Sequence, residues 1–343
     1  MFSRIFSGLD SYHVFYYFLL YSFIGWCWEV FYVYLRTGKV VNRGFLSGPF
    51  CPIYGFGASA VYIVLDPVAN NNFAIFFGGM ILATVLEYFT GTIMENLFHA
   101  KWWDYSDIKF NLKGRICLPV SIGWGFFSVI MMRIMHPAVK SVVAVLPHAV
   151  GNVLMYIIIG YFVADTISAA KAAFNLDKAL ARMEQAREEL REKIENTKLY
   201  ESKEELLAKI EATQREFEEF LKEKETLMDA KKAFYKEEIS DRIEALSEKY
   251  PEAAQRTEEA IKNFKEGQAE FKEKLAKAGE ELRLKHRAYV ELMKPTAMQK
   301  RLLNAYPDLK SIKHNEALTR IREEMLKKVK EAKKARKEIN KEN

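Results

Sequence analysis

Three glutamates interrupt long apolar stretches in the first half of the chain. Glu29 lies within residues 12–35, and Glu87 and Glu95 lie within residues 75–98. A stretch of about 20 apolar residues is long enough to cross a lipid bilayer as a helix. Ionisable side chains inside such a helix are costly, so they usually face a bundle interior or a cavity and mark a functional site. These glutamates are therefore the first candidates for a functional site.

Two of the glutamates belong to a regular pattern. Gly79, Ala83, Glu87, Gly91 and Glu95 recur at every fourth position, which places them along one face of a helix. Small residues on a membrane helix allow a neighbouring helix to approach closely. We expect this face to pack against protein.

Arginines near the ends of the predicted spans are the expected partners of these carboxylates. Arg43 or Arg115 can pair with Glu87 or Glu95, because an unpaired carboxylate in a low dielectric would otherwise take up a proton. Two interpretations stay open: the ion pairs only fix the helices to one another, or they belong to a substrate or coupling-ion site.

The predicted topology brings further polar residues to the same membrane face. The first and third spans end there, and the second and fourth begin there. The candidate intramembrane polar site consists of Glu29, Asn42, Arg43, Cys51, Tyr54, Glu87, Glu95, Trp103, Asp104, Tyr105, Arg115 and Cys117.

Motifs of other chemistries are missing from the sequence. His99, His136 and His148 do not converge with Cys or Asp at metal-ligand spacing, so neither a metal nor another cofactor is predicted. The segment 37–40 lacks the upstream glycine and the Ser/Thr of a P-loop, and no GxSxG or HExxH pattern occurs. No catalytic residue is assigned. Trp102 is interpreted as an anchor in the headgroup zone.

Five apolar stretches supply the elements that would position the site. The predicted spans are residues 12–35, 45–65, 75–98, 118–135 and 142–164. The second is irregular, because Pro49 and Pro52 would break its helical hydrogen bonding. It is either a broken or re-entrant segment, or a surface loop that ends at Pro52 and is followed by a short tilted helix.

The second half of the chain has a different composition. Residues 1–170 contain ten Lys/Arg and eight Asp/Glu, which leaves 41 and 37 of the chain's 51 and 45 for the remainder. Because acidic and basic residues alternate there, no nucleic-acid partner is predicted. We expect a transmembrane domain over 1–168, a coiled-coil helical region over 169–307 and a basic C-terminal tail over 308–343.

The coiled-coil region shows heptad spacing, for example at Leu176, Leu180 and Met183. Residues 203–249 and 252–293 are similar in length and are joined by a proline break, which is typical of an antiparallel helical hairpin. The fold class is therefore all-α: a polytopic transmembrane helix bundle followed by a coiled-coil helical hairpin.

The distribution of Lys and Arg predicts the orientation in the cell membrane. Basic residues gather in the first loop and the third loop, whereas the second loop has none and the fourth has only Lys140. Loops rich in Lys and Arg usually face the cytoplasm. We therefore expect the N-terminus outside and the coiled coil inside.

Several blocks of residues carry a family resemblance. They are Phe23-Ile24-Gly25-Trp26 with Glu29, Asn42 to Leu46, Gly48-Pro49, Cys51 to Gly55 with Gly57, Glu87-Tyr88 with Thr90-Gly91 and Glu95, Trp103 to Ser106, and Asn111 with Gly114 to Cys117. With these blocks, about the first 165 residues resemble the bacterial family of putative ABC-transporter type IV permeases. The resemblance implies a multi-span permease that needs a separate ABC ATPase subunit, with dimerisation supplying further spans.

Three functions follow as hypotheses. The first is a permease-like transport subunit. The second is a membrane-anchored scaffold, in which the spans hold a coiled coil that recruits protein partners. The third is a membrane enzyme that acts on a lipid headgroup. All three place the chain in a lipid bilayer, and the first depends on the resemblance.

Overall fold

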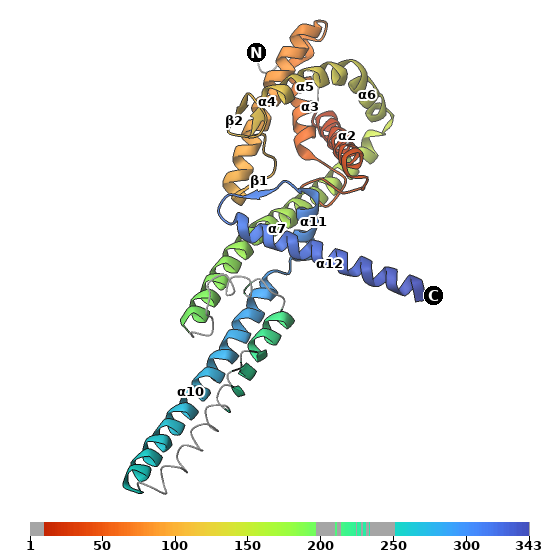
Figure 1. Ribbon diagram of the computed structural model, residues 1–343. Coiled ribbons are helices and arrows are strands. Elements are labelled where there is room, and N and C mark those ends of the chain that lie inside the picture. Colours follow the sequence, from red (N-terminus) through yellow and green to blue (C-terminus); the bar gives the residue numbers. More distant parts are fainter. Residues whose placement is uncertain are drawn as a thin grey trace. The chain divides into compact units, whose positions relative to one another are not determined.

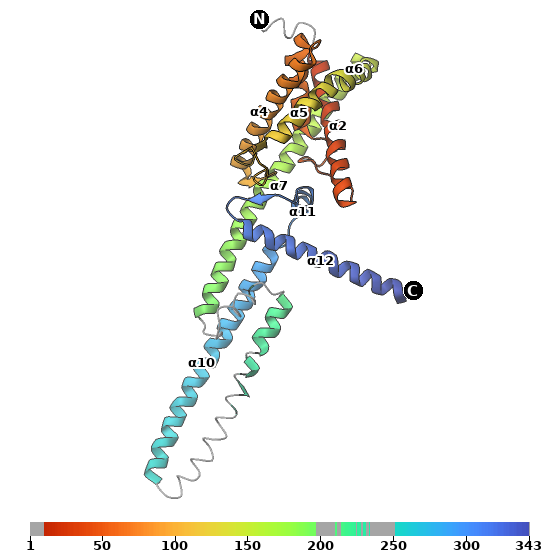
Figure 2. The ribbon, with the colours of Figure 1, turned by 45° about the horizontal axis from the view of Figure 1, so that its top comes forward.

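The structure is a computed structural model that describes residues 10–196, 210, 214–223, 225–227, 229, 230, 233 and 251–342. It is mostly helical (Figures 1 and 2). The chain forms two compact units, Met1–Leu180 with Pro295–Asn343, and Ala181–Lys294. Residues 295–343 thus belong to the same unit as the apolar helices, a division that differs from the expected domain boundaries.

The first unit contains most of the secondary structure. Its elements are α2 (Ser11–Thr37), α3 (Pro52–Leu65), η1 (Asp66–Val68), α4 (Asn72–Phe98), β1 (Ala100–Lys101), β2 (Asn111–Leu112), β3 (Ile116–Cys117), α5 (Leu118–Ile130), η2 (Met131–Met135), α6 (His136–Val145), the first part of α7 (His148–Asn196), α11 (Ala297–Ala305), β4 (Lys310–Ser311) and α12 (Asn315–Glu342). The short antiparallel pairs β1–β4 and β2–β3 were not expected from the all-α prediction.

Four segments are long and apolar enough to cross a membrane. They are Ser11–Thr37, Asn72–Phe98, Leu118–Val145 and His148–Glu195. Local signals fix several of their ends: Asp10 accepts a hydrogen bond from the His13 backbone N–H at the start of α2, and Gly38 ends that helix with a φ of 66°. The structure thus contains four long apolar helices that could be membrane spans.

The predicted second span contains only a short apolar helix. α3 begins at Pro52 and continues into η1. A proline is tolerated at the first position of a helix, because the backbone N–H it lacks would have no partner within the helix. The residues before Pro52 are irregular, and the backbone N–H of Cys51 donates to the Ser22 carbonyl, 2.9 Å away. Because Ser22 lies near the middle of α2, the irregular segment reaches the interior of the bundle.

The fourth predicted span is longer than the sequence indicated. The prediction ended it at residue 135 and placed Lys140 in a loop, but α5, η2 and α6 continue without interruption to Val145. Pro137 has no backbone N–H to donate, and the π-turn η2 precedes it in the helix. The loop lies instead at Leu146 and Pro147.

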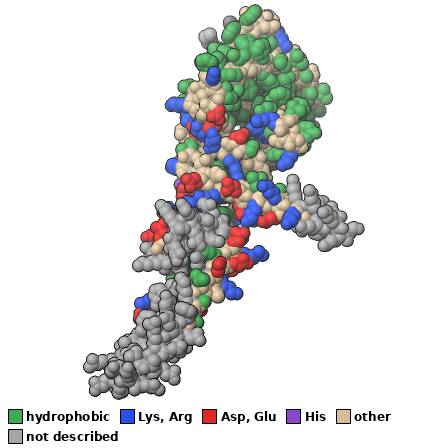
Figure 3. Space-filling view, viewed as in Figure 1, with side chains coloured by type: hydrophobic (Ala, Val, Ile, Leu, Met, Phe, Trp, Pro, Cys, Tyr) green, Lys and Arg blue, Asp and Glu red, His purple; other side chains and the backbone are tan. Residues whose placement is uncertain are grey.

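The two faces of α4 differ as the sequence pattern predicted. Gly79, Glu87, Gly91 and Glu95 are buried, and Ser128 of α5 packs against Gly79. The opposite face exposes Phe73, Phe77, Ile81, Val85, Phe89 and Ile93. On the face drawn in Figure 3, hydrophobic side chains cover much of the surface of the apolar helices. Such a surface is suited to lipid.

The second unit consists of helices that carry many charges. Residues 181–196 of α7, the described residues between 210 and 233, and α10 (Pro251–Leu292) belong to it. Phe217 stacks on His286 with ring centroids 4.0 Å apart, and Arg283 pairs with Glu225. The predicted turn at Tyr250 and much of 203–249 lie outside the described residues, so the coiled-coil hairpin stays a prediction.

Candidate functional site

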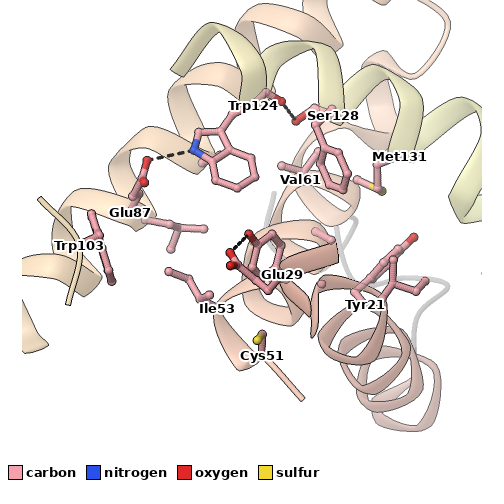
Figure 4. A pocket seen from close by; sticks show the side chains of 18 of the residues that line it. Tyr21, Glu29, Cys51, Ile53, Val61, Glu87, Trp103, Trp124, Ser128 and Met131 are labelled. Atoms are coloured by element: carbon pink, nitrogen blue, oxygen red, sulfur yellow. Dashed lines mark hydrogen bonds between the residues drawn. The ribbon is translucent and has the colours of Figure 1, made fainter. Parts of the chain in front are cut away.

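A cavity of about 210 Å³ lies inside the first unit. Side chains from α2, α3, α4 and α5 line it, together with residues of the loops before α3 and α5. Its wall is rich in aromatic side chains, namely Tyr21, Tyr54, Trp102, Trp103, Tyr105, Trp124, Phe127 and Tyr306. Glu29 and Glu87 are the carboxylates of this wall (Figure 4).

Glu29 is held by two partners. The Tyr54 hydroxyl donates to its Oε1 at 2.6 Å, and Arg43 Nε lies 3.3 Å from its Oε2. Gly25 precedes Glu29 by one helical turn, and a Cβ atom at this position would overlap the Tyr54 ring. A glycine at position 25 therefore lets α3 approach α2 closely enough for the tyrosine to reach the carboxylate.

Glu87 is held by two neutral donors. The Tyr105 hydroxyl donates to Oε1 at 3.1 Å. Trp124 Nε1 donates to Oε2 at 3.0 Å, and Figure 4 draws this second bond as a dashed line. Burial and the neighbouring Glu87 carboxylate raise the pKa of Tyr105, so this phenol stays protonated and donates. Glu87 is only 7% exposed, and no cation pairs with it among the described residues.

The irregular segment beside the cavity has its backbone groups satisfied by two charged side chains. Asp165 of α7 accepts from the backbone N–H groups of Ser47 and Gly48 at 3.0 and 2.9 Å. Arg301 of α11 donates to the carbonyls of Gly44, Phe45 and Leu46 at 2.6 to 2.9 Å. Non-helical backbone in a membrane bundle requires such internal partners.

The C-terminal part of the chain completes the wall. The Tyr306 ring packs edge-on against Trp102, and both side chains line the cavity. Lys310 Nζ lies 2.8 Å from Asp104 Oδ2, next to the β1–β4 pair. Burial raises the pKa of Asp104, but hydrogen bonds from Lys310 and Ser106 outweigh burial, so this pKa lies well below its usual value.

The structure separates the predicted site residues into two groups. Seven line the cavity: Glu29, Arg43, Cys51, Tyr54, Glu87, Trp103 and Tyr105. The other five lie outside its lining: Asn42, Glu95, Asp104, Arg115 and Cys117. Arg115 Nε donates to Glu95 at 2.9 Å, as one of the predicted pairings required. Arg43 pairs with Glu29, so the predicted alternative of a pair between Arg43 and Glu87 is not formed.

The remaining residues outside the lining have positioning contacts. Asn42 accepts from Trp26 Nε1 at 2.8 Å, which fixes the loop before α3 to α2. Cys117 is buried in β3, opposite Asn111. Among the residues that the structure describes, no three His, Cys, Asp or Glu side chains come together as metal ligands would.

Several residues of the site were missed in the sequence. Trp102 was interpreted as an interfacial anchor, but it is 4% exposed and packs against Phe45 and Phe98, so that interpretation is wrong. Trp124 gave a usable signal, because a buried indole N–H needs an acceptor and the preceding span offers two carboxylates, Glu87 and Glu95. The sequence contains no signal for the role of Arg301, since its acceptors are backbone carbonyls about 250 residues away along the chain.

The fold and the cavity define a multi-pass membrane protein with a polar pocket inside its apolar helices. Residues 16–170 match the model of a family described as "Putative ABC-transporter type IV", and this part of the chain belongs to that family. The matched residues include Glu29, Arg43 and Glu87. They exclude Arg301 and Tyr306. No curated protein and no solved structure matched the chain.

Proposed function

We propose that this chain is a permease-like subunit of a membrane transporter and that the cavity is its ligand-binding site. The observation that carries the proposal is the placement of two carboxylates, buried Glu87 and half-buried Glu29, on the wall of a cavity inside an apolar bundle. Broken helices and irregular backbone beside a central site are typical of transporters. The segment before α3, held by Asp165 and Arg301, is irregular backbone of this kind.

The distribution of charge supports an orientation for this site. The loops at residues 38–51 and 99–117, which both lie at the end of the bundle where α2 and α4 finish, contain the basic residues of the bundle's connections. We infer that this end faces the cytoplasm, with the N-terminus outside. The irregular segment and α3 together then supply a fifth crossing of the cell membrane.

Transport of this type needs a source of energy from another chain. The sequence contains no P-loop, and the family description names an ABC transporter. We infer a separate ABC ATPase subunit that contacts the basic loops, with a second copy of this chain supplying further spans.

Purification from native membranes tests this function. The full chain is cross-linked, extracted in mild detergent and analysed by mass spectrometry, beside a variant in which a flexible linker replaces residues 181–294. Transport predicts that a P-loop ATPase copurifies with both forms and hydrolyses ATP. Absence of any ATPase from both forms would contradict it.

The second unit favours a second candidate, a membrane-anchored scaffold. Residues 181–294 form a compact unit of their own, and none of them lines the cavity. In this case the same purification would recover protein partners only with the full chain. The enzyme hypothesis gains no support from the described residues, because Asp104 is paired with Lys310 and lies outside the cavity lining.

A further inference from the structure

The cavity wall offers several aromatic rings to a ligand. Trp102, Trp103 and Trp124 line the cavity with Tyr54, Tyr105 and Tyr306. The face of an indole ring carries partial negative charge, and tryptophan is the best of the aromatic side chains at attracting a cation. Groups of such rings recognise quaternary ammonium ligands. The rings therefore favour a positively charged organic group.

The formal charges of the wall point in the same direction. Glu29 is balanced by Arg43, 3.3 Å away. Glu87 accepts hydrogen bonds only from Tyr105 and Trp124, which are neutral donors, and no cation in the described part of the chain balances it. A buried carboxylate without a cation tends to take up a proton, and a bound cation would stabilise its ionised form instead. With both glutamates ionised, the lining residues leave one negative charge in the cavity. A single cation would neutralise that charge.

One polar group of the wall still needs a partner. Trp102 Nε1 is buried and donates to no acceptor among the residues described. A buried donor without an acceptor costs about 1–3 kcal/mol, so a ligand that supplies an acceptor gains this amount. The unpaired N–H of Trp102 is a separate observation from the charge of Glu87, because Trp102 lies in the loop before β2 whereas Glu87 lies on α4.

We propose that the cavity binds a small organic cation that also carries a hydrogen-bond acceptor, with its positive charge between Glu87 and the tryptophan rings. A quaternary ammonium with a hydroxyl group has this chemistry. The volume of about 210 Å³ equals about seven water molecules at about 30 Å³ each, which is enough for such a molecule. The proposal rests on the proposed function in that it names the ligand class of the same site.

Calorimetric titration of the purified full chain in detergent tests the proposal. The probes are choline, tetramethylammonium and 3,3-dimethylbutan-1-ol, in which an uncharged carbon replaces the nitrogen of choline. We expect saturable binding of choline, with the uncharged analogue bound about tenfold more weakly or worse. Equal binding of the uncharged analogue, or no binding of either cation, would overturn the proposal.

Three variants locate the bound cation. Glu87→Gln removes the charge at similar volume: its amide oxygen can still accept from Trp124 Nε1, and its NH2 group can donate to the Tyr105 hydroxyl. This variant should weaken choline binding about tenfold or more. Trp102→Phe removes the donor, so choline affinity should fall to that of tetramethylammonium. Glu316→Gln is the control for loss of one carboxylate, because Glu316 on α12 is 75% exposed and lies outside the cavity lining. Its choline affinity should equal that of the unmodified chain, and an equal loss in Glu316→Gln and Glu87→Gln overturns the assignment.

The choline titration and the test of transport can fail independently of each other. Binding is measured on the single chain and requires no ATPase. Recovery of an ATPase without cation binding would remove this inference and leave the transport function intact. Cation binding without an ATPase would support the inference and contradict ATP-driven transport.

Discussion

The two compact units use charged residues in different ways. In the first unit, Arg115 and Glu95 form an ion pair whose side chains are 15% and 10% exposed, and the two residues come from a loop and from α4. In the second unit, Lys274 and Glu270 pair within one helix and are 72% and 67% exposed. Charge inside the first unit fixes distant parts of the chain and surrounds a cavity, whereas charge on the second unit is solvated.

Breaking the Arg115–Glu95 pair should give the largest effect. Arg115→Ala leaves the Glu95 carboxylate buried without its cation, which typically costs about 3–5 kcal/mol. Thermal unfolding in detergent should therefore occur at a clearly lower temperature. The double variant Arg115→Ala with Glu95→Ala removes the uncompensated charge and should recover part of the loss. A single variant as stable as the unmodified chain would show that this pair does not hold the loop to α4.

Removal of Arg301 should have the next largest effect. Arg301→Ala leaves the carbonyls of Gly44, Phe45 and Leu46 without their donor. Each unsatisfied buried carbonyl costs about 1–3 kcal/mol of unfolding free energy. Water can enter the space left by the arginine and bind some of the carbonyls, so we expect a total loss of about 2–3 kcal/mol. Limited proteolysis should then cut faster between α11 and α12.

The control for Arg301 is Lys328→Ala on α12. Lys328 pairs with Glu324 one turn away, and its side chain is 54% exposed. Its proteolysis rate should match that of the unmodified chain. Equal rates for Arg301→Ala and the unmodified chain would mean that the three hydrogen bonds do not retain the C-terminal segment.

The Lys310–Asp104 pair should depend on salt more than on pH. Folding lowers the pKa of Asp104. Its contribution to the free energy of unfolding is therefore fully present above the unfolded pKa of 3.8, and it is lost as the pH falls through the lower pKa of the folded state. The hydrogen bond to Asp104 raises the pKa of Lys310, so its contribution is present below 10.5 and is lost as the pH rises through the raised folded value. Both groups stay charged between about pH 5 and pH 9.

A cross-link between β1 and β4 measures how often β4 lies paired with β1, which the Lys310–Asp104 pair should favour. Ala100 and Ser311 are direct partners in the β1–β4 pair, so cysteines at these two positions should form a disulfide. With oxidised glutathione as the oxidant and at a fixed pH of about 8, we expect a smaller yield at about 1 M salt than at low salt, because salt screens exposed charges. Equal yields at low and high salt would show that the Lys310–Asp104 pair does not hold β4 against β1.

The sequence predicted those parts of the first unit that depend on periodicity. The stripe of Gly79, Glu87 and Gly91 on α4 was found because residues spaced four apart lie on one face of a helix, and small residues mark the face that packs against protein. The cost of a buried carboxylate predicted that Arg43 or Arg115 pairs with Glu87 or Glu95, and the structure forms one of these four pairs, Arg115 with Glu95. Both inferences need only local spacing and the electrostatics of a low dielectric.

The parts that depend on the C-terminal segment could not be predicted in this way. Arg301 binds backbone carbonyls, which every residue carries, so no residue type in the loop before α3 signals the contact. Tyr306 and Trp102 meet across about 200 residues of chain. Trp102 also follows directly after an apolar helix, where a tryptophan more commonly lies in the headgroup zone. Tertiary contacts therefore decided this part of the cavity.

The smallest effect is expected on the helices of the second unit. Lys274→Ala removes a pair within α10 that is largely solvated, and exposed pairs of this kind contribute little to stability because water already solvates both charges. Thermal unfolding and the choline titration of this variant should both match those of the unmodified chain. A clear fall in unfolding temperature would mean that Lys274 contacts another chain or another part of this one. The contrast between solvated charge in the second unit and buried charge in the first would then no longer hold.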